Sequence, residues 1–460
     1  MFAIPPLLAL LFIDYLKPQE FIPVLASLPL LYLFTALALL GFVIDVRIGL
    51  SRLAATPQLP WVILFVVWAL ITVAINAPAT FAARAIFLFI PVSLYLLVGH
   101  AVQSFRMLQV VIGVLLAICL FLAAIGVHQG LAPWGCHQIT FLHGDGIYTY
   151  DGRECSDENR VICDAEQAEP GADYMCEHVG LFNTHSDHGR VRYRGALADP
   201  NELALALGIA VPFAFAFVDR KRSRSRELVL ILTLGLVGVC AVFTQSRGGQ
   251  IVFLAVLGVY FLQRYGVRGL LFGTILALPL LLLGGRSGAD AESSTIERTE
   301  CWYEGMLMFW HQPLFGVGSG QFTEHHYLTA HNSYVLSSAE LGLPGMWIWT
   351  SIMYLSTKIP VKLLWQRRLT GVEPPPVART WSLAFLAAMT GMIVGVFFLS
   401  YCYKEIFWIY VGLTGALYLA IKRHQPTFEV KLTARDAGIV LAIDVVLVLF
   451  ISVYTRWKVG

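Results

Sequence analysis

The stretch LQVVIGVLLAICLFLAAIGV, residues 108–127, runs for 20 residues without a charged side chain. Roughly 20 apolar residues in a helix span the hydrocarbon core of a bilayer, so this stretch predicts a transmembrane helix. Twelve further apolar runs are candidates, although several are short or interrupted by a charge such as Asp14 or Arg84: residues 2–16, 21–44, 61–75, 81–99, 202–218, 228–243, 250–262, 269–284, 346–359, 381–398, 405–421 and 437–455. We therefore predict an all-α, polytopic integral membrane protein in which twelve or thirteen transmembrane helices form a single domain over residues 1–460.

The composition agrees with this fold class. Hydrophobic residues make up 57% of the chain and charged residues 13%, whereas soluble domains contain about 25% charged residues. The net charge of +2 gives no reason to expect a nucleic-acid partner. The first apolar run has neither a basic segment before it nor a small-residue cleavage site after it, so we interpret it as a membrane helix and not as a signal peptide.

A strongly basic loop orients the helices in the membrane. The sequence DRKRSRSRE, residues 219–227, contains five basic side chains, and short loops rich in Lys and Arg stay on the cytoplasmic side. Counting outward from this loop puts further basic loops on the same side, at residues 45–52, 103–107, 263–268, 362–368 and 421–425. The long loops at residues 128–201 and 285–345 are then expected on the outer side.

The first outer loop has the chemistry of an exported segment. Residues 128–200 contain twelve Asp or Glu, five Arg and no Lys, together with Cys136, Cys155, Cys163 and Cys176. Four cysteines in an exported loop predict two disulfides, whose pairing the sequence leaves open. A structural zinc site is the alternative, although the spacings are not those of CxxC pairs. The cysteines in or beside apolar runs are interpreted as packing residues: Cys119, Cys240 and Cys402.

Arg247, in the sequence TQSRGGQ, is expected at the outer edge of the membrane between two apolar runs. A guanidinium group is costly to desolvate there, so it faces a partner or a polar cavity. The alternative is an arginine that extends from a helix end to the interface. Gly248 and Gly249 favour a binding role, because glycines let a ligand or a backbone approach closely.

A second group of arginines precedes the point where the chain re-enters the membrane. Arg190, Arg192 and Arg194 alternate along the sequence RVRYRGALADPNELAL. The DPN triplet predicts a turn followed by a helix start, whose free amides together with Arg194 would form an anion site. Pairing with nearby carboxylates or with anionic lipid headgroups is the alternative for these arginines.

Residues 296–322 predict a helix followed by a glycine-rich turn. Tyr303, Met306, Leu307 and Trp310 recur on one helical face, which indicates either a helix lying in the membrane interface or one packed on other protein. The turn GVGSG, residues 316–320, is rich in amides, but a lone glycine cluster is weak evidence for a phosphate-binding loop.

His331 begins the sequence HNSYVLSSAELGLPG, which predicts a helix start at Asn332 or Ser333 and a stop at GLPG. The positive end of a helix disfavours protonation, so we expect a neutral imidazole that can accept a proton. Glu340 would lie on the opposite helical face and Ser338 on the face of His331. A structural histidine is the alternative, as is a metal site built from His325, His326 and His331 or from His185, Asp187 and His188.

The motifs occur in a distinctive order: SRGG (246–249), Arg298 and Trp302 before LMFWHQPLFGVGSGQF (307–322), HNSYV (331–335) and AELGLPG (339–345). This set resembles the bacterial O-antigen ligases and their relatives, the O-antigen polymerases and O-linked oligosaccharyltransferases. Gln312 interrupts the family's usual histidine-proline pair.

The resemblance implies a C-type membrane fold and an inverting, metal-independent glycosyltransferase without a cofactor. Such ligases take a polysaccharide from undecaprenyl diphosphate at the periplasmic face of the bacterial inner membrane. They transfer it to a sugar hydroxyl of the lipid A core, so the lipid-linked donor, the lipid A core and the bilayer are the implied partners. Residues 285–345 would form a periplasmic catalytic loop and residues 128–201 a second periplasmic loop with disulfides.

The resemblance also implies roles for individual residues. His331 matches the family's essential histidine, which would act as the general base, and Arg247 matches its membrane-edge arginine. Arg194 and Arg298, with Arg192 beside the former, are further candidates for binding the diphosphate. Fixed arginines would neutralise the leaving group in the way that Mg²⁺ does in many phosphate sites.

Three other activities remain open at the level of sequence. A polymerase would use another lipid-linked glycan as acceptor, and an oligosaccharyltransferase would use a protein hydroxyl. A transporter of lipid-linked glycan would use the same arginines for binding, but inverted repeats with broken helices, which are typical of transporters, are not visible in the sequence.

Overall fold

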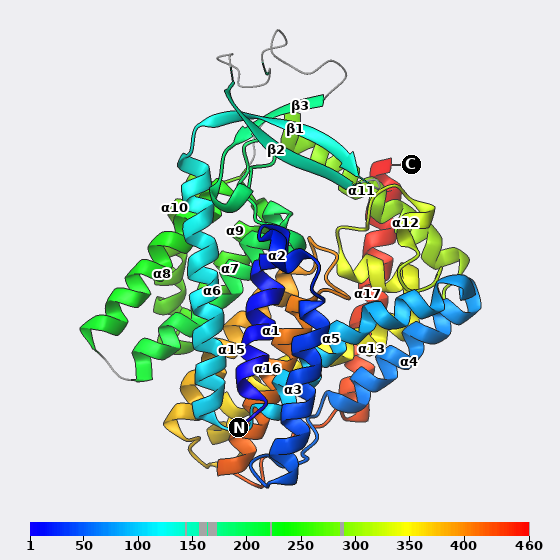
Figure 1. Cartoon of the computed structure of the whole chain (residues 1–460). Helices are drawn as coiled ribbons and strands as arrows, with labels where there is room; N and C mark the ends of the chain where they lie inside the picture. Colours follow the sequence, from blue (N-terminus) through cyan, green and yellow to red (C-terminus); the bar gives the residue numbers. More distant parts are fainter. Residues whose placement is uncertain (143–144, 156–162, 164–172, 221–222, 286–288, 460) are drawn as a thin grey trace.

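The computed structural model describes residues 1–142, 145–155, 163, 173–220, 223–285 and 289–459. Each predicted apolar run lies on a helix of the bundle in Figure 1. These helices are α1 (Ile4–Leu16), α3 (Leu30–Arg47), α4 (Leu59–Asn76), α5 (Phe81–Ala101), α6 (Phe105–Leu131), α7 (Pro200–Arg220), α8 (Arg224–Phe243), α9 (Arg247–Tyr265), α10 (Val267–Leu283), α13 (Ser333–Leu364), α15 (Pro376–Gly395), α16 (Glu405–His424) and α17 (Ala434–Val459).

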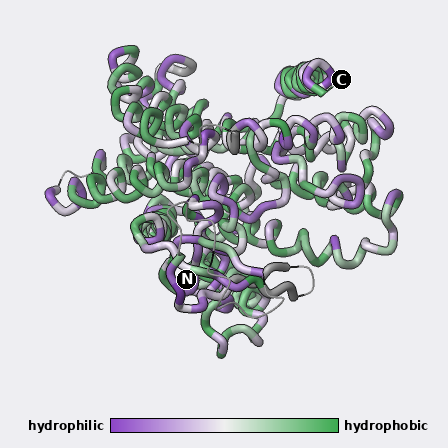
Figure 2. The backbone as a smooth tube through the Cα atoms, turned by 90° about the horizontal axis from the view of Figure 1, so that it is seen from above, coloured by the Kyte–Doolittle hydropathy of each residue, from purple (hydrophilic) through white to green (hydrophobic). Residues whose placement is uncertain are grey.

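The 23-residue helix α11 (Ala289–His311) and seven short elements connect them: η1 (Pro18–Glu20), α2 (Pro23–Ala26), η2 (Pro78–Thr80), η4 (Leu181–Asn183), η5 (Gly195–Leu197), α12 (Phe322–His325) and α14 (Gln366–Thr370). Among the described residues, 9 helices are long and apolar enough to cross a membrane. Figure 2 shows the helical stretches coloured mainly as hydrophobic. The prediction of a polytopic helical membrane protein is therefore confirmed.

Prolines and a glycine set two of the helix boundaries. The run 21–44 becomes a full helix only at Leu30, because Pro23 and Pro29 lack an amide hydrogen and constrain the residue before them. The stop predicted at GLPG falls at Gly342, whose φ of 65° and ψ of −176° are not helical, so α13 consists of two helices that meet at a kink there. Glycine adopts this left-handed conformation without the steric cost of a Cβ atom.

α7 and α16 form the centre of the bundle. In the apolar membrane-length part of each helix, 83% of α7 and 89% of α16 is buried inside the protein. By the same measure α8 is 22% buried and α17 28%, so these helices present their sides to lipid. α16 packs closely on α5, where a Cβ atom at Gly99 would lie 3.4 Å from the carbonyl oxygen of Gly412. Small residues at such crossings bring membrane helices together.

The loop between α6 and α7 contains a small β-sheet, which the all-α prediction did not include. β1 (Trp134–Leu142) pairs antiparallel with β2 (Asp145–Glu154) and with β3 (Asp173–His178), in the order β2-β1-β3. Figure 1 shows the sheet covering one end of the bundle, away from the basic connection between α7 and α8. The sequence of this loop is acidic and does not alternate regularly between apolar and polar residues, so no strand is predicted there.

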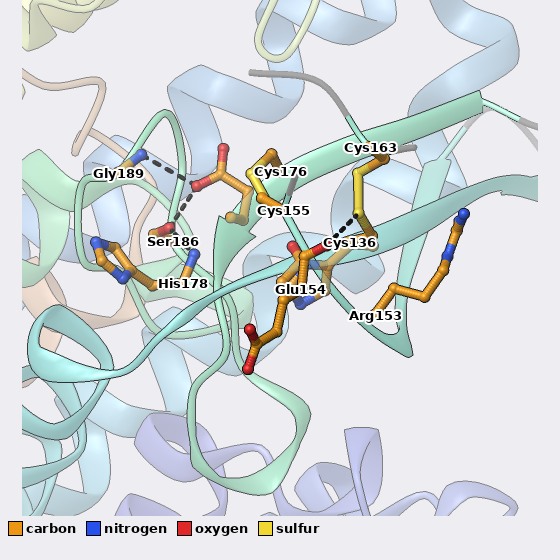
Figure 3. Close-up of a disulfide and its surroundings, with 12 residues drawn as sticks. Cys136, Arg153, Glu154, Cys155, Cys163, Cys176, His178, Ser186 and Gly189 are labelled. Atoms are coloured by element: carbon orange, nitrogen blue, oxygen red, sulfur yellow. Dashed lines mark hydrogen bonds between the residues drawn. A yellow bond between two sulfur atoms is a disulfide. The ribbon is translucent and has the colours of Figure 1, made fainter. Parts of the chain in front are cut away.

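Two disulfides join the cysteines of this loop, as predicted. Cys136 pairs with Cys163 and Cys155 with Cys176, at Cα–Cα distances of 5.7 and 6.1 Å. Figure 3 shows the two bridges close together against the sheet. The sulfur atoms are therefore engaged with one another and not arranged as zinc ligands. The cysteines assigned to packing, with Cys301, are buried and unbridged: Cys119, Cys240 and Cys402.

α11 packs against α13 and α17, which favours the second interpretation of its aromatic face. Met306 is 3% exposed, and the indole nitrogen of Trp310 donates to Ser452 Oγ of α17 at 3.0 Å. The helix is therefore held by protein contacts and carries its polar first half toward the sheet end of the bundle.

Candidate active site

A polar cavity of about 1080 Å³, here called the large cavity, lies between the sheet and the adjoining helix ends. β1 and β3 each contribute to its wall, as do residues 187–201, the α8–α9 connection, the α10–α11 connection and residues 328–331. Its ionisable and amide side chains are His178, Asp187, His188, Arg190, Asp199, Asn201, Gln245, Glu297, Arg298 and His331.

A second cavity of about 310 Å³, here called the small cavity, approaches the same histidine. Among the described residues that line the two spaces, Asp199 and His331 belong to both. Its other charged lining residues are Arg84, Glu202, Glu340 and Lys404. The imidazole of His331 is therefore accessible from two separate spaces.

His331 is held in an unusual backbone conformation, with φ at 48°. Such a conformation costs a non-glycine residue about 1–3 kcal/mol and persists where the surroundings enforce it. The next residue, Asn332, caps α13 by accepting hydrogen bonds from the amides of Tyr334 at 2.9 Å and Val335 at 3.2 Å. The helix start predicted at Asn332 or Ser333 is confirmed, and it fixes the direction of the His331 side chain.

Burial lowers the pKa of His331 below 6.5, and the positive charge of Arg298 lowers this pKa further, while Asp199 and Glu297 oppose the shift. This lowered pKa favours the neutral imidazole that the sequence analysis expects. The main cause is burial and not the helix end to which the prediction attributed it.

Arg298 and Arg247 lie on a common recess. This recess, of about 50 Å³, shares Asn201, Gln245, Ser294 and Arg298 with the large cavity and adds Arg247 at the start of α9. Ser246 caps α9 by accepting from the amide of Gly249 at 2.9 Å. The structure therefore brings His331, Arg298 and Arg247 to one connected space.

The glycines after Arg247 serve helix packing. A Cβ atom at Gly249 would lie 2.5 Å from the Cβ of Ala204 on α7, and one at Gly248 would lie 3.3 Å from Phe398. These glycines were expected to admit a ligand or a backbone. Gly249 admits the close approach of α7, and Gly248 borders the recess as well as Phe398.

Arg190 enters the large cavity, whereas Arg192 and Arg194 lie outside its lining. Arg192 donates to the ring of His185, at 3.1 Å to Nε2, while Nδ1 of that ring donates to the carbonyl oxygen of Ser186 at 2.9 Å. Arg194 donates to the carbonyl oxygen of Phe182, and its guanidinium lies 5.0 Å from the ring centre of Phe21. The structure does not bring these two arginines to His331.

Asn201 connects the parts of the large cavity. Its Oδ1 accepts from Ser246 Oγ at 2.7 Å and from Arg190 Nη2 at 3.3 Å, while its Nδ2 donates to Asp199 Oδ1 at 2.8 Å. Arg190 also donates through Nε to the carbonyl oxygen of Thr244 at 3.1 Å. One buried amide therefore fixes the positions of Arg190, Asp199 and the start of α9.

The helix start at the DPN triplet is confirmed, but its amides are not free. Asp199 Oδ1 accepts from the backbone amide of Asn201 at 2.7 Å, and the carbonyl oxygen of Asp199 accepts from the amide of Glu202 at 3.0 Å. A carboxylate of the chain itself thus occupies the anion position at this helix end. The prediction used the triplet as a turn and a helix start whose amides would bind an anion together with Arg194, and so did not name Asp199 and Asn201 as site residues.

The amides of the glycine-rich turn are likewise taken. The carboxylate of Glu340 accepts from the amides of Gly320 at 2.7 Å and Phe322 at 3.0 Å, and the carbonyl oxygen of Glu340 accepts from Gly318 at 3.0 Å. The turn wraps around a buried carboxylate and is no phosphate-binding loop. Glu340 and His331 both line the small cavity.

An apolar groove of about 290 Å³ continues from the large cavity between α8 and α10. Val242 and Leu283 line both spaces. Gly235 and Gly238 of α8 border the groove, and a Cβ atom at either position would meet nothing within 4 Å. The large cavity is thus joined to an apolar groove on lipid-facing helices.

The sheet supports the wall of the large cavity through Glu177 of β3, which is 1% exposed. Its carboxylate accepts from Ser186 Oγ and from the amides of His188 at 2.6 Å and Gly189 at 3.0 Å. Figure 3 shows Ser186 and Gly189 beside the strand that carries Cys176. The disulfide-bridged sheet therefore holds the turn that leads to Arg190.

Within the described part of the chain, the group of cysteine, histidine and acidic side chains close enough to share one ion consists of Cys136, Cys155 and Cys163. These sulfur atoms are already in disulfides. His185 instead contacts Arg192, and its pKa is lowered to about 3 by burial and by that arginine.

The fold and the site define a polytopic helical membrane protein with a neutral histidine and arginines in a polar cavity at one end of the bundle. Residues 230–350 match the family model described as O-antigen ligase. This match is consistent with a member of the O-antigen ligase family and confirms the resemblance carried by the motifs. Proteins of this family are glycosyltransferase-type enzymes, ligases or polymerases. No curated protein matches the chain.

The matched segment contains Arg247, Arg298 and His331 and ends within α13. The large cavity also depends on Arg190, Asp199 and Asn201, which precede the matched segment.

Proposed function

We propose that the protein is an O-antigen ligase of the bacterial inner membrane with its active site facing the periplasm. It would transfer a polysaccharide from undecaprenyl diphosphate to a sugar hydroxyl of the lipid A core, with inversion at the anomeric carbon. The observation that carries this proposal is the position of His331, a neutral base in the wall between two cavities, one of which contains Arg298 and leads to Arg247.

The large cavity suits the lipid-linked donor. The diphosphate would bind at Arg298 and Arg247, whose guanidinium groups stay charged and match phosphate oxygens in geometry. Arg190 adds a third cation to the same wall. The apolar groove that starts at Val242 and Leu283 would take the first isoprene units of the lipid. A headgroup site joined to a hydrophobic groove supports a substrate that remains anchored in the membrane.

His331 would act on the acceptor. As the acceptor oxygen attacks the anomeric carbon, its proton passes to the imidazole, which the lowered pKa keeps neutral beforehand. The bond between the anomeric carbon and the diphosphate oxygen breaks, and its electron pair leaves with the diphosphate. The arginines stabilise the charge that develops on that oxygen, a role that a preorganised cation performs well in a water-poor site. The histidine releases its proton to water after the product departs.

The proposal can be tested with purified protein in lipid nanodiscs. Undecaprenyl diphosphate-linked glycan and rough lipopolysaccharide are supplied with and without EDTA, and the product is a lipopolysaccharide of higher mass. We expect product in both tubes, none with His331→Gln, and normal product with His311→Gln, an exposed histidine outside both cavities.

The other activities predict different products from the same tubes. Extension of one lipid-linked glycan by another, with unmodified lipopolysaccharide, would identify a polymerase. Transfer to a protein hydroxyl would identify an oligosaccharyltransferase, and movement of intact donor across the bilayer would identify a transporter. Loss of product with EDTA alone would contradict the metal-independent mechanism.

A further inference from the structure

Arg84, a lone cation within an apolar run of the sequence, lies on α5 beside the small cavity. Its Nε donates to Ser319 Oγ at 2.9 Å. Its guanidinium carbon lies 4.0 Å from the ring centre of Tyr403 and 4.6 Å from that of Phe87. A cation placed among aromatic rings on a membrane-spanning helix is costly to desolvate, and such residues are as a rule functional.

The glycine-rich turn is shaped to receive this guanidinium. A Cβ atom at Gly320 would lie 2.8 Å from Arg84 Nη1, and Gly320 has φ at 79°. The carboxylate of Glu340 fixes the turn through the amides of Gly320 and Phe322. The GVGSG turn therefore packs against the guanidinium of Arg84 and positions it. The sequence alone did not indicate this role for the turn.

One donor of Arg84 remains available. Nη2 is buried and has no hydrogen-bond partner among the described residues. Buried donors are nearly always paired in folded proteins, so this group is arranged for a ligand that enters the small cavity. The ligand would then lie within a space that also borders His331.

The charges around the small cavity define the ligand further. Arg84 and Lys404 face three carboxylates, those of Asp199, Glu202 and Glu340. Lys404 Nζ pairs with Glu202 Oε1 at 3.2 Å. A phosphate group would meet this excess of carboxylates, whereas a neutral sugar can bond to both signs of charge through its hydroxyls.

We propose that the small cavity binds the neutral sugar of the acceptor and that Arg84 is the residue that holds it. This inference rests on the proposed transferase function, which assigns the donor to the large cavity and the acceptor to the small cavity. A donor in the large cavity and a sugar in the small cavity would meet at His331, with the acceptor hydroxyl facing the imidazole.

The experiment measures binding and transfer separately. Binding of a fluorescent core oligosaccharide, released from rough lipopolysaccharide, is titrated against the full-length protein in nanodiscs, with lipid A as a second probe. Loss of a charge-assisted hydrogen bond predicts that Arg84→Gln weakens oligosaccharide binding about tenfold to a hundredfold. Binding of lipid A should not change. In transfer assays the acceptor KM should rise by the same factor, with the donor KM unchanged.

Gly320→Ala provides a second variant, because it displaces the guanidinium without removing it. Gly371→Ala is its matched control: Gly371 has φ at 73°, but a Cβ atom there meets nothing within 4 Å. We expect the Gly320 variant to behave like Arg84→Gln and the Gly371 variant to behave like the wild type.

Unchanged oligosaccharide binding in both Arg84→Gln and Gly320→Ala, or no binding to the wild type, would overturn the inference. Equal weakening of lipid A binding would assign the cavity to the phosphorylated lipid instead of the neutral sugar. A wild-type protein that binds the oligosaccharide through Arg84 but forms no product would contradict the proposed ligase and leave the sugar site standing.

Discussion

Replacement of Ser246 by alanine tests the network that positions the start of α9. Ser246 Oγ accepts from the amide of Gly249 at 2.9 Å and donates to Asn201 Oδ1 at 2.7 Å, and the residue is 1% exposed. Loss of a serine cap costs about 1 kcal/mol, and loss of a buried hydrogen bond costs about 1 kcal/mol more. Ser246→Ala should therefore lower the free energy of unfolding by about 2 kcal/mol.

The matched control is Ser223, which caps α8 at the opposite end of the bundle. Its Oγ accepts from the amide of Arg226 at 3.4 Å and makes no bond to another helix among the described residues. Ser223→Ala should lower the free energy of unfolding by at most about 1 kcal/mol. The assay is reversible denaturation in mixed micelles with increasing dodecyl sulfate, followed by tryptophan fluorescence.

A double-mutant cycle isolates the contact between the helices. Ser246→Ala and Asn201→Ala should couple by about 1 kcal/mol, because either change alone removes their shared hydrogen bond. Ser246→Ala should also raise the donor KM, since Arg247 follows directly. The reasoning is refuted if the two serine variants are equally stable, or if the effects of Ser246→Ala and Asn201→Ala are additive.

Three further predictions concern catalysis. His331→Gln should lower kcat about 10²–10⁴-fold, the usual contribution of a general base, with the donor KM retained in transfer assays. Because burial and Arg298 hold the pKa of His331 below 6.5, the rate should rise with pH on the acid side and level off near neutrality. Arg298→Gln should move this limb to higher pH and Asp199→Asn to lower pH in rate–pH profiles; movement in the same direction would contradict the assignment. Gly238→Leu should fill the apolar groove and raise the KM of the undecaprenyl donor but not of a short-chain donor, while Gly438→Leu, at an equally open position on α17, should leave both unchanged.

The helices and the helix start that follows His331 could be predicted from sequence because each depends on local pattern. Apolar runs of membrane length report burial in lipid directly, and the Asn332 cap follows from residue type alone. The paired cysteines followed from their number and their acidic, exported surroundings. The helix boundaries at prolines and the bend at Gly342 also depend on local geometry. How the chain continues on either side of them is set by packing.

The partners of the base depend on contacts that sequence spacing does not encode. Arg190, Arg192 and Arg194 alternate in the sequence as in a strand, yet the chain between them is irregular, so only Arg190 reaches the large cavity. Arg84 was visible only as an interruption of an apolar run. The residues that hold its guanidinium, Ser319 and Gly320, are more than 200 positions away in the sequence.

The shared wall at Asp199 and His331 has a kinetic consequence. Because the large and small cavities meet at His331, donor and acceptor can be bound at the same time. The sugar can then pass directly from donor to acceptor without a covalent intermediate on the protein. Initial-rate plots at several fixed acceptor concentrations should intersect, as for a ternary complex, and should not run parallel as for a covalent intermediate. Labelled undecaprenyl diphosphate should accordingly not exchange into the donor pool until acceptor is added.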